Sequence, residues 1–110
     1  MNKTNISIAS DRNFNQEMIE QLKEKYPNTK FVLMAQHEFD HFSILSITIG
    51  SLQLIAQLVN LAINIKRKNK NSKAVIEIRL RNRKLKIDLD DNKINVNKLI
   101  EKFLESAKSD

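Results

Sequence analysis

The chain has 110 residues, about the length of one ordinary domain, and its 41% hydrophobic and 29% charged residues are the balance of a folded globular protein. Cysteine is absent, which excludes disulfides, cysteine-ligated zinc and thiol catalysis. The formal net charge of +6 permits weak attraction to nucleic acid or anionic lipid without identifying a partner. From this length we expect a single domain over residues 1–110. Met1–Asn5 lacks the apolar core of a signal peptide, so we expect the protein in the cytoplasm.

The first third of the chain predicts a strand, a helix and a second strand. Asn5–Ala9 alternates apolar and polar residues, which predicts a short strand. Asn13–Tyr26 carries apolar residues every four positions, which predicts a helix capped by Asn13 and ended by Pro27. Lys30–Ala35 is a compact apolar run, and we expect it to be a buried strand.

The middle of the chain predicts a strand followed by the most apolar helix. Phe42–Ile49 alternates and is rich in β-branched residues, which favours a strand. Gly50 breaks it, and Ser51 is a suitable N-cap for a helix over Leu52–Lys68. This helix is apolar over most of its circumference. Its narrow polar stripe consists of four amides, Gln53, Gln57, Asn60 and Asn64.

The last third predicts a basic linker, a β-hairpin and a helix. Lys66–Lys73 is basic and rich in asparagine, and Asn95 is positioned to cap the final helix. A hairpin turn at Asn82-Arg83 pairs apolar residues on one face: Leu80 with Leu85, Ile78 with Ile87, and Ile76 with Leu89. The opposite face then carries Glu77, Arg79, Arg81, Lys84, Lys86 and Asp88.

The predicted order of elements is therefore β-α-β-β-α-β-β-α, which indicates the α+β class. The first six elements suit a ferredoxin-like, split βαβ layer, to which a fifth strand and a C-terminal helix are added. We expect the helices to cover one face of the sheet or both. Neither an internal repeat nor a domain boundary is evident, so residues 1–110 form one α+β domain.

The segment His37–His41 matches H-E-x-x-H, in which two histidines one helical turn apart bind zinc and the glutamate activates water. That mechanism needs a helix, whereas this segment falls between two predicted strands. A third histidine is also missing from the chain. We therefore expect a polar loop, no metal, no other cofactor and no enzyme activity. A zinc-dependent hydrolase using His37, Glu38 and His41 is the third functional hypothesis.

Phe42–Ile65 runs for 24 residues without a charge and is followed by a basic cluster, the pattern of a membrane span. Gly50-Ser51 divides this run, and its first half has the period of a strand. Four amides on one stripe would also be costly in lipid. We therefore expect a buried strand and a core helix.

Two surfaces could bind a macromolecule. The hairpin residues Arg79, Arg81, Lys84 and Lys86 share a predicted face near the basic linker, which makes nucleic-acid binding the second functional hypothesis. No platform of aromatic residues for stacking bases is evident. The favoured hypothesis is protein binding or self-association through the apolar helix, with contacts from Leu52, Gln53, Gln57, Leu58, Asn60 and Asn64. Burial of that helix between the sheet and the last helix is the alternative.

The order of segments resembles the effector-associated constant component, a small domain of bacterial conflict systems. The most distinctive matching features are the Gly50-Ser51 junction, the apolar helix Leu52–Ile65 and the basic Lys66-Arg67-Lys68 after it. The other matching segments are Phe14–Tyr26, Lys30–Ala35, Ser43–Ile49, Val75–Leu80, Leu85–Leu89 and Asn95–Leu104. The resemblance implies a non-catalytic accessory component that acts beside adaptor domains and proteases, and it supplies no catalytic residues.

Overall fold

A computed structural model describes residues 4–35, 42–91 and 93–108. These residues form five strands and three helices, and the predicted α+β class is confirmed. The elements in chain order are β1 (Thr4–Asp11), α1 (Arg12–Lys25), β2 (Lys30–Ala35), β3 (Phe42–Ile49), α2 (Gln53–Lys68), β4 (Ala74–Leu80), β5 (Arg83–Asp88) and α3 (Val96–Lys108).

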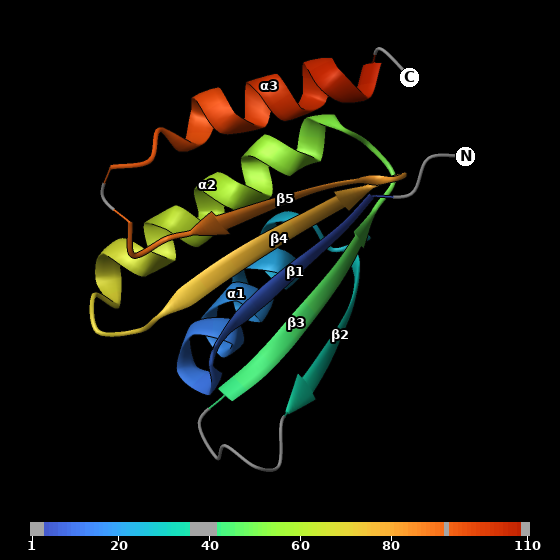
Figure 1. The fold of residues 1–110 in the computed structure, drawn as a ribbon. Coiled ribbons are helices and arrows are strands. Elements are labelled where there is room, and N and C mark those ends of the chain that lie inside the picture. Colours follow the sequence, from blue (N-terminus) through green and yellow to red (C-terminus); the bar gives the residue numbers. More distant parts are fainter. Residues whose placement is uncertain (1–3, 36–41, 92, 109–110) are drawn as a thin grey trace.

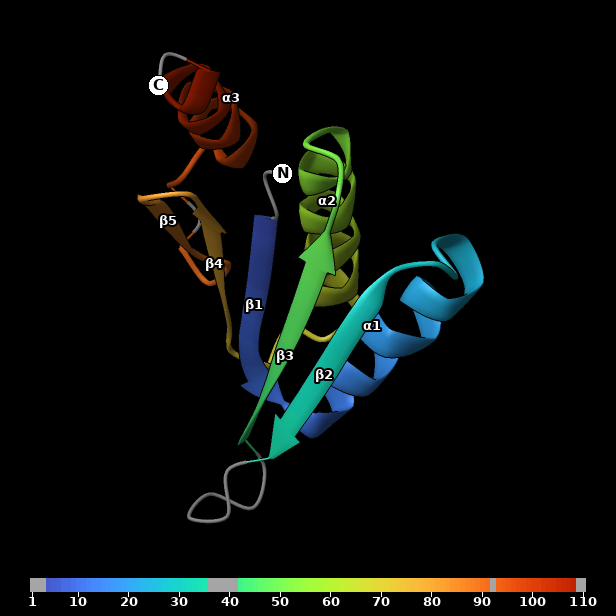
Figure 2. The ribbon, with the colours of Figure 1, turned by 90° about the vertical axis from the view of Figure 1, so that its right-hand side faces the viewer.

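The five strands form one sheet in the order β2-β3-β1-β4-β5, and all neighbouring strands are antiparallel. The central strand is β1, whereas β2 and β5 form the two edges. Helices α1 and α2 lie behind the sheet, and α3 lies beside α2 at the β5 side (Figures 1 and 2). No helix of the described residues lies on the opposite face of the sheet, so this sheet has an inner face and an open face.

Strict alternation of side chains separates these two faces. The inner face carries alternate residues of each strand, such as Ile6 and Ile8 in β1, paired with Ile47 and Leu45 in β3. Each of these four side chains is at most 1% exposed. Because apolar residues recur with a period of two, only one face can enter the core. The same core contains Phe14, Met18 and Leu22 of α1, Ile55, Leu58, Ala62 and Ile65 of α2, and Ile100 and Phe103 of α3.

Helix α2 uses most of its apolar circumference inside the molecule. Its buried residues are Ile55, Leu58, Val59, Leu61, Ala62 and Ile65, and they share one cluster with α1, α3 and the sheet. A helix flanked on several sides needs a wider apolar stripe than a helix on one sheet. The breadth of apolar surface in Leu52–Lys68 is therefore explained by internal packing.

A buried polar network joins α1 to the central strands. Asn15 is 0% exposed, and its amide Nδ2 donates to the Ser43 hydroxyl at 2.9 Å and to the Ile8 carbonyl at 3.3 Å. The Ser43 hydroxyl in turn donates to the Ser10 carbonyl at 3.2 Å. The hydrogen bonds of Asn15 Nδ2 favour one docking position of α1 on β1 and β3, whereas the buried Asn15 Oδ1 has no partner within the described residues.

Three local predictions about helix starts have different outcomes. The N-cap of α1 is Asp11, whose carboxylate accepts from the Phe14 backbone N–H at 2.8 Å, so the predicted cap at Asn13 is wrong. An aspartate three residues before a free N–H caps as well as asparagine, and here two such candidates, Asp11 and Asn13, lie two residues apart. The N-cap of α2 is Leu52, so the N-cap predicted at Ser51 is wrong by one residue, although the Ser51 hydroxyl accepts from the Gln53 N–H at 3.3 Å. Asn95 accepts from the Lys98 N–H at 3.2 Å, as predicted.

The β4–β5 hairpin turns one residue earlier than predicted. Leu80 pairs with Arg83, so the turn residues are Arg81 and Asn82, and Ile78 pairs with Leu85 rather than Ile87. Arg81 adopts a positive φ of 58°, a conformation typical of tight hairpin turns. Moving the turn by one residue changes each pairing partner by two, so the predicted register is wrong by two residues. A shift of two leaves every strand residue on its predicted face, because side chains alternate with a period of two.

Candidate protein-interaction surface

The open face of the sheet changes from apolar to charged across its width. The strand register places Met34, Ile44, Ala9 and Val75 side by side in a row from β2 to β4. A second row, Val32, Ser46, Ser7, Glu77 and Lys86, and a third row, Lys30, Thr48, Asn5, Arg79 and Lys84, run beside it. Apart from Lys30 in β2, the large apolar side chains of this face thus gather towards β2, and the charged side chains gather towards β5.

The β2 corner of this face exposes large apolar side chains. Val32 is 60% exposed and Met34 is 53% exposed, while the neighbouring Ile44 is half-buried. We call these three residues the β2 surface. The prediction of a buried strand at Lys30–Ala35 is wrong for Val32 and Met34. Their strand has only its inner face against the core, where Phe31 and Leu33 are partly buried.

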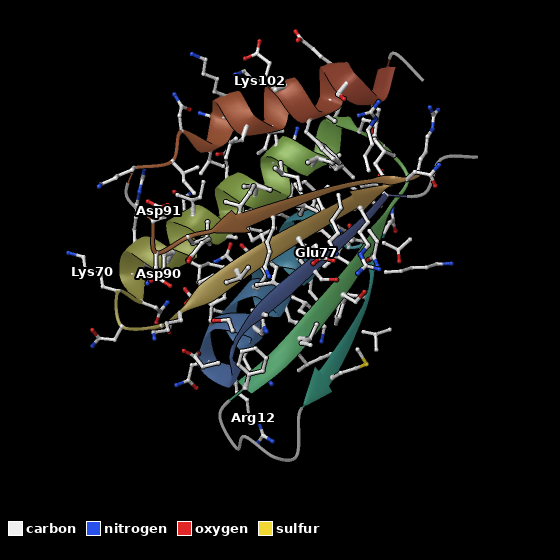
Figure 3. All side chains as sticks on the ribbon, viewed as in Figure 1. Arg12, Lys70, Glu77, Asp90, Asp91 and Lys102 are labelled. Carbon is white, nitrogen blue, oxygen red and sulfur yellow. The ribbon has the colours of Figure 1, made fainter. Side chains whose placement is uncertain are left out.

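The charged corner is partly neutralised by its own acidic residue. Arg79 Nε donates to Glu77 Oε1 at 2.6 Å, and Lys84 Nζ lies 3.8 Å from Glu77 Oε2. The hydrogen bond from Arg79, together with the positive charges of Lys84 and Lys86, holds the pKa of Glu77 below its usual value. Figure 3 shows Glu77 on the open side of the sheet. This acidic residue reduces the attraction of the corner for phosphate groups.

Arg81 does not share this face with Arg79, Lys84 and Lys86. It belongs to the hairpin turn, and its Nη1 donates to the Ala107 carbonyl of α3 at 3.4 Å. The predicted placement of Arg81 on the strand face is therefore wrong, because the turn falls one residue earlier than expected. Its guanidinium instead links the hairpin to the last turns of α3.

The amide stripe of α2 lies at the molecular surface. Gln53, Gln57, Asn60 and Asn64 are exposed, and Leu52 is half-buried. Gln57 accepts a hydrogen bond from the Tyr26 hydroxyl at 2.9 Å, which ties the stripe to the end of α1. Leu58 is 1% exposed and contributes to the core, so it is unavailable to a partner of the folded chain. The stripe offers polar contacts with little exposed apolar surface around them.

A groove runs between the second half of α2 and the connection from β5 to α3. Its lining includes Asn60, Asn64 and Arg67 on one side and 88–91 and 93–97 on the other. Lys66 closes part of this region: its Nζ lies 2.7 Å from Asp90 Oδ1 and donates to the Lys70 and Ser72 carbonyls. Lys70 and Asp90 lie at the same end of the molecule (Figure 3). Acidic and basic groups both line the groove, so it selects neither anions nor cations.

The predicted metal and membrane features have separate outcomes. His37, Glu38 and His41 lie outside the described residues, so the zinc hypothesis stays a prediction. Within residues 4–35, 42–91 and 93–108, no three His, Cys, Asp or Glu side chains are grouped to hold a metal ion. The uncharged run Phe42–Ile65 is divided into β3 and α2. None of the helices in the described part is both long and apolar enough to cross a membrane.

Neither a protein-family model nor a curated protein matches the sequence. Among solved structures, the fold is similar to the de novo designed protein Foldit4, with a TM-score of 0.57. The identity is 17%, and the similarity covers 74% of this chain and 98% of that chain. At this level of identity the likeness concerns the fold alone.

One feature of the sequence indicates the β2 surface: apolar residues on both faces of the strand Phe42–Ile49. In Phe42–Ile49 the buried positions are 43, 45, 47 and 49, yet Phe42 and Ile44 occupy the opposite face. Apolar residues on both faces at the start of this strand indicate that the open face is apolar there. Val32 and Met34 carry the same signal in β2, where it was interpreted as burial on both faces.

Proposed function

We propose that this chain is a non-catalytic protein-interaction component that binds its partner through the β2 surface. The observation that carries the proposal is the exposure of Val32 and Met34 beside Ile44 on an edge strand. Contiguous apolar residues at the surface of a small domain are typical of protein-binding sites. An edge strand beside them adds backbone N–H and C=O groups that can pair with an incoming strand.

The arrangement of the first six elements supports a ferredoxin-like interpretation of the architecture. In sheet order, β1 lies between β3 and β4, and β3 separates β1 from β2. A split βαβ unit has this property, because another strand lies between the two strands that its helix connects. Strand β5 and helix α3 are then additions beside β4. In this interpretation β2 is an edge strand of the ferredoxin-like layer, and β5 pairs with β4, which would otherwise be the other edge strand.

The resemblance to the effector-associated constant component supports the same functional class. The segments that carry this resemblance have the same types and the same order as the elements from α1 to α3. Under this proposal the chain is an accessory component of a bacterial conflict or signalling system and acts beside adaptor or effector proteins. The exposed amide stripe on α2 is a second surface available to such a complex.

A photo-crosslinking amino acid in place of Val32, in cells that contain the proteins with which the chain naturally occurs, tests this proposal. We expect covalent adducts from Val32 to a protein, whereas the same amino acid at Glu101, an exposed residue of α3, forms none. Both positions are exposed, so the comparison controls for accessibility. Adducts from Glu101 in place of Val32 would contradict the proposed surface.

Nucleic-acid binding remains a second candidate because Lys84 and Lys86 are both exposed on the open face of β5. Fluorescence anisotropy with labelled RNA and DNA tests it. Salt-dependent binding that is lost in Arg79→Ala/Lys86→Ala would favour this candidate over protein binding. The neutralisation of Arg79 by Glu77 leads us to expect no such binding at physiological salt.

A further inference from the structure

The outer edge of β2 has the features of a strand that pairs with another strand. In the sheet as described, its neighbour is β3, and the pairing runs without interruption from Lys30 to Ala35. An uninterrupted register means that no bulge bends this edge away, and the strand contains neither proline nor glycine. Bulges and proline are two of the features by which edge strands avoid pairing, so Phe31–Ala35 is competent to pair, and Lys30 is the one charged residue of the strand.

Charge favours β2 over β5 as the edge at which two copies can pair. The chain carries a net charge of +6, so two copies repel each other through most approaches. Strand β2 carries a single charge, Lys30, at its first residue, and Phe31–Ala35 is uncharged. A second copy can therefore approach along β2 with less repulsion than along β5, where Arg83, Lys84 and Lys86 lie close together.

Antiparallel symmetry then separates the lysines of the two copies. In a symmetric antiparallel pair, the inner faces of both sheets lie on the same side only if one residue lies opposite itself at the two-fold axis. At the middle of β2 this central residue is Val32 or Leu33. In these two registers the Lys30 residues lie about 13 to 20 Å apart along the strands, given a rise of about 3.3 Å per residue. That separation exceeds the screening length of about 8 Å at physiological ionic strength.

The same geometry covers apolar surface on both faces. On the open face, Val32 of one copy lies opposite Val32 of the other in the Val32-centred register and opposite Met34 in the Leu33-centred register. Both side chains are more than half exposed in the single chain. On the inner face, the partly buried Phe31 lies opposite Leu33 in the Val32-centred register, and Leu33 lies opposite Leu33 in the other. A six-residue strand offers a short interface, so the dimer belongs to the weak, concentration-dependent class.

From these observations we infer that β2 pairs antiparallel with β2 of a second copy, so that two five-stranded sheets form one continuous sheet. This inference rests on the proposed function, for which it names a partner at the β2 surface. The recognition chemistry is backbone pairing along the strand edge, reinforced by apolar contacts from Val32 and Met34 on the open face.

The variant Val32→Lys/Met34→Lys tests this dimer by light scattering. In either register the new lysines face lysines of the second copy directly, which destabilises the pairing. Both side chains are exposed, so we expect the variant to fold, and circular dichroism with thermal unfolding checks this. The matched control, Gln53→Lys/Asn64→Lys, adds the same charge to the exposed amide stripe of α2.

Wild type and control should show a weight-average mass that rises from near the monomer value towards the dimer value between about 1 and 500 μM, while the β2 variant stays monomeric. Wild-type-like dimerisation of the folded β2 variant would overturn the inference, as would loss of the dimer in the α2 control alone. A monomeric wild type at every concentration would also overturn it. In that case crosslinking from Val32 to a different protein would leave the proposed function standing, and absence of both signals would end both.

Discussion

The two edges of the sheet differ in how they are protected. Strand β5 carries Arg83, Lys84, Lys86 and Asp88, contacts α3, and ends a hairpin whose Arg81 reaches the Ala107 carbonyl. Strand β2 is uncharged after Lys30, has its main contacts with β3, and exposes apolar side chains on its open face. Charges and a covering helix are common ways to prevent strands from pairing at an edge. The contrast teaches that this fold closes one edge and leaves the other available for binding.

The largest expected effect comes from truncating the inner face of each edge strand. Ile87 in β5 is 0% exposed, whereas Leu33 in β2 is only partly buried. Ile87→Ala should lower the free energy of unfolding by about 2–5 kcal/mol, because it removes a fully packed side chain and leaves a cavity. Leu33→Ala should cost about 1 kcal/mol, since less of its surface leaves water on folding.

Urea unfolding of both variants at low protein concentration measures this difference. Low concentration matters because association through β2 would add stability to the wild type. Equal losses for Ile87→Ala and Leu33→Ala would show that the β2 side is as well covered as the β5 side, and the contrast between the edges would then fail.

A smaller effect on stability is expected from the buried hydrogen bonds that join α1 to β1 and β3. Asn15 links α1 to the Ile8 carbonyl of β1 and to Ser43 of β3, the strand that holds β2 in place. Asn15→Ala should destabilise the chain by about 1–3 kcal/mol, because it leaves buried acceptors without donors. Thermal unfolding measures the loss. As a control, Asn13→Ala on the exposed side of α1 should change stability by less than about 0.5 kcal/mol.

The smallest effect concerns the charged corner near β5. Glu77→Gln should reduce stability at pH 7 by less than about 1 kcal/mol, because exposed ion pairs contribute little. The lowered pKa of Glu77 sets the sign of the pH dependence: its contribution is present above the carboxyl pKa of the unfolded chain and is lost as the pH falls through the folded pKa. Unfolding at neutral and acidic pH measures this. A gap between wild type and Glu77→Gln that widens on acidification would contradict the assignment.

Side-chain alternation made much of this fold predictable from the sequence. The faces of β1, β3 and β4 follow directly from a period of two, and the amide stripe of α2 marks its solvent side. The predicted hairpin register was wrong by two residues, yet the strand residues kept their faces. Local periodicity is set by neighbouring residues, so it can be interpreted without knowledge of the distant chain.

The place of each strand in the sheet could not be predicted in this way. Val32 and Met34 look like core residues in the sequence, and only the order β2-β3-β1-β4-β5 makes their strand an edge. That order depends on contacts between segments far apart in the chain. The same limit applied to Leu58, whose burial requires α1, α3 and the sheet to surround α2. The candidate surface therefore emerged from the topology more than from the composition.

Hydrogen exchange of the backbone amides in the two edge strands tests the central contrast most directly. Amides of β2 that point away from β3 should exchange fast in dilute protein and become protected as concentration rises, because a second strand then accepts their hydrogen bonds. Amides of β5 should keep the same exchange rates at all concentrations. If association occurs with β2 exchange unchanged, or if the protection appears in β5, the account of an open β2 edge and a closed β5 edge is contradicted.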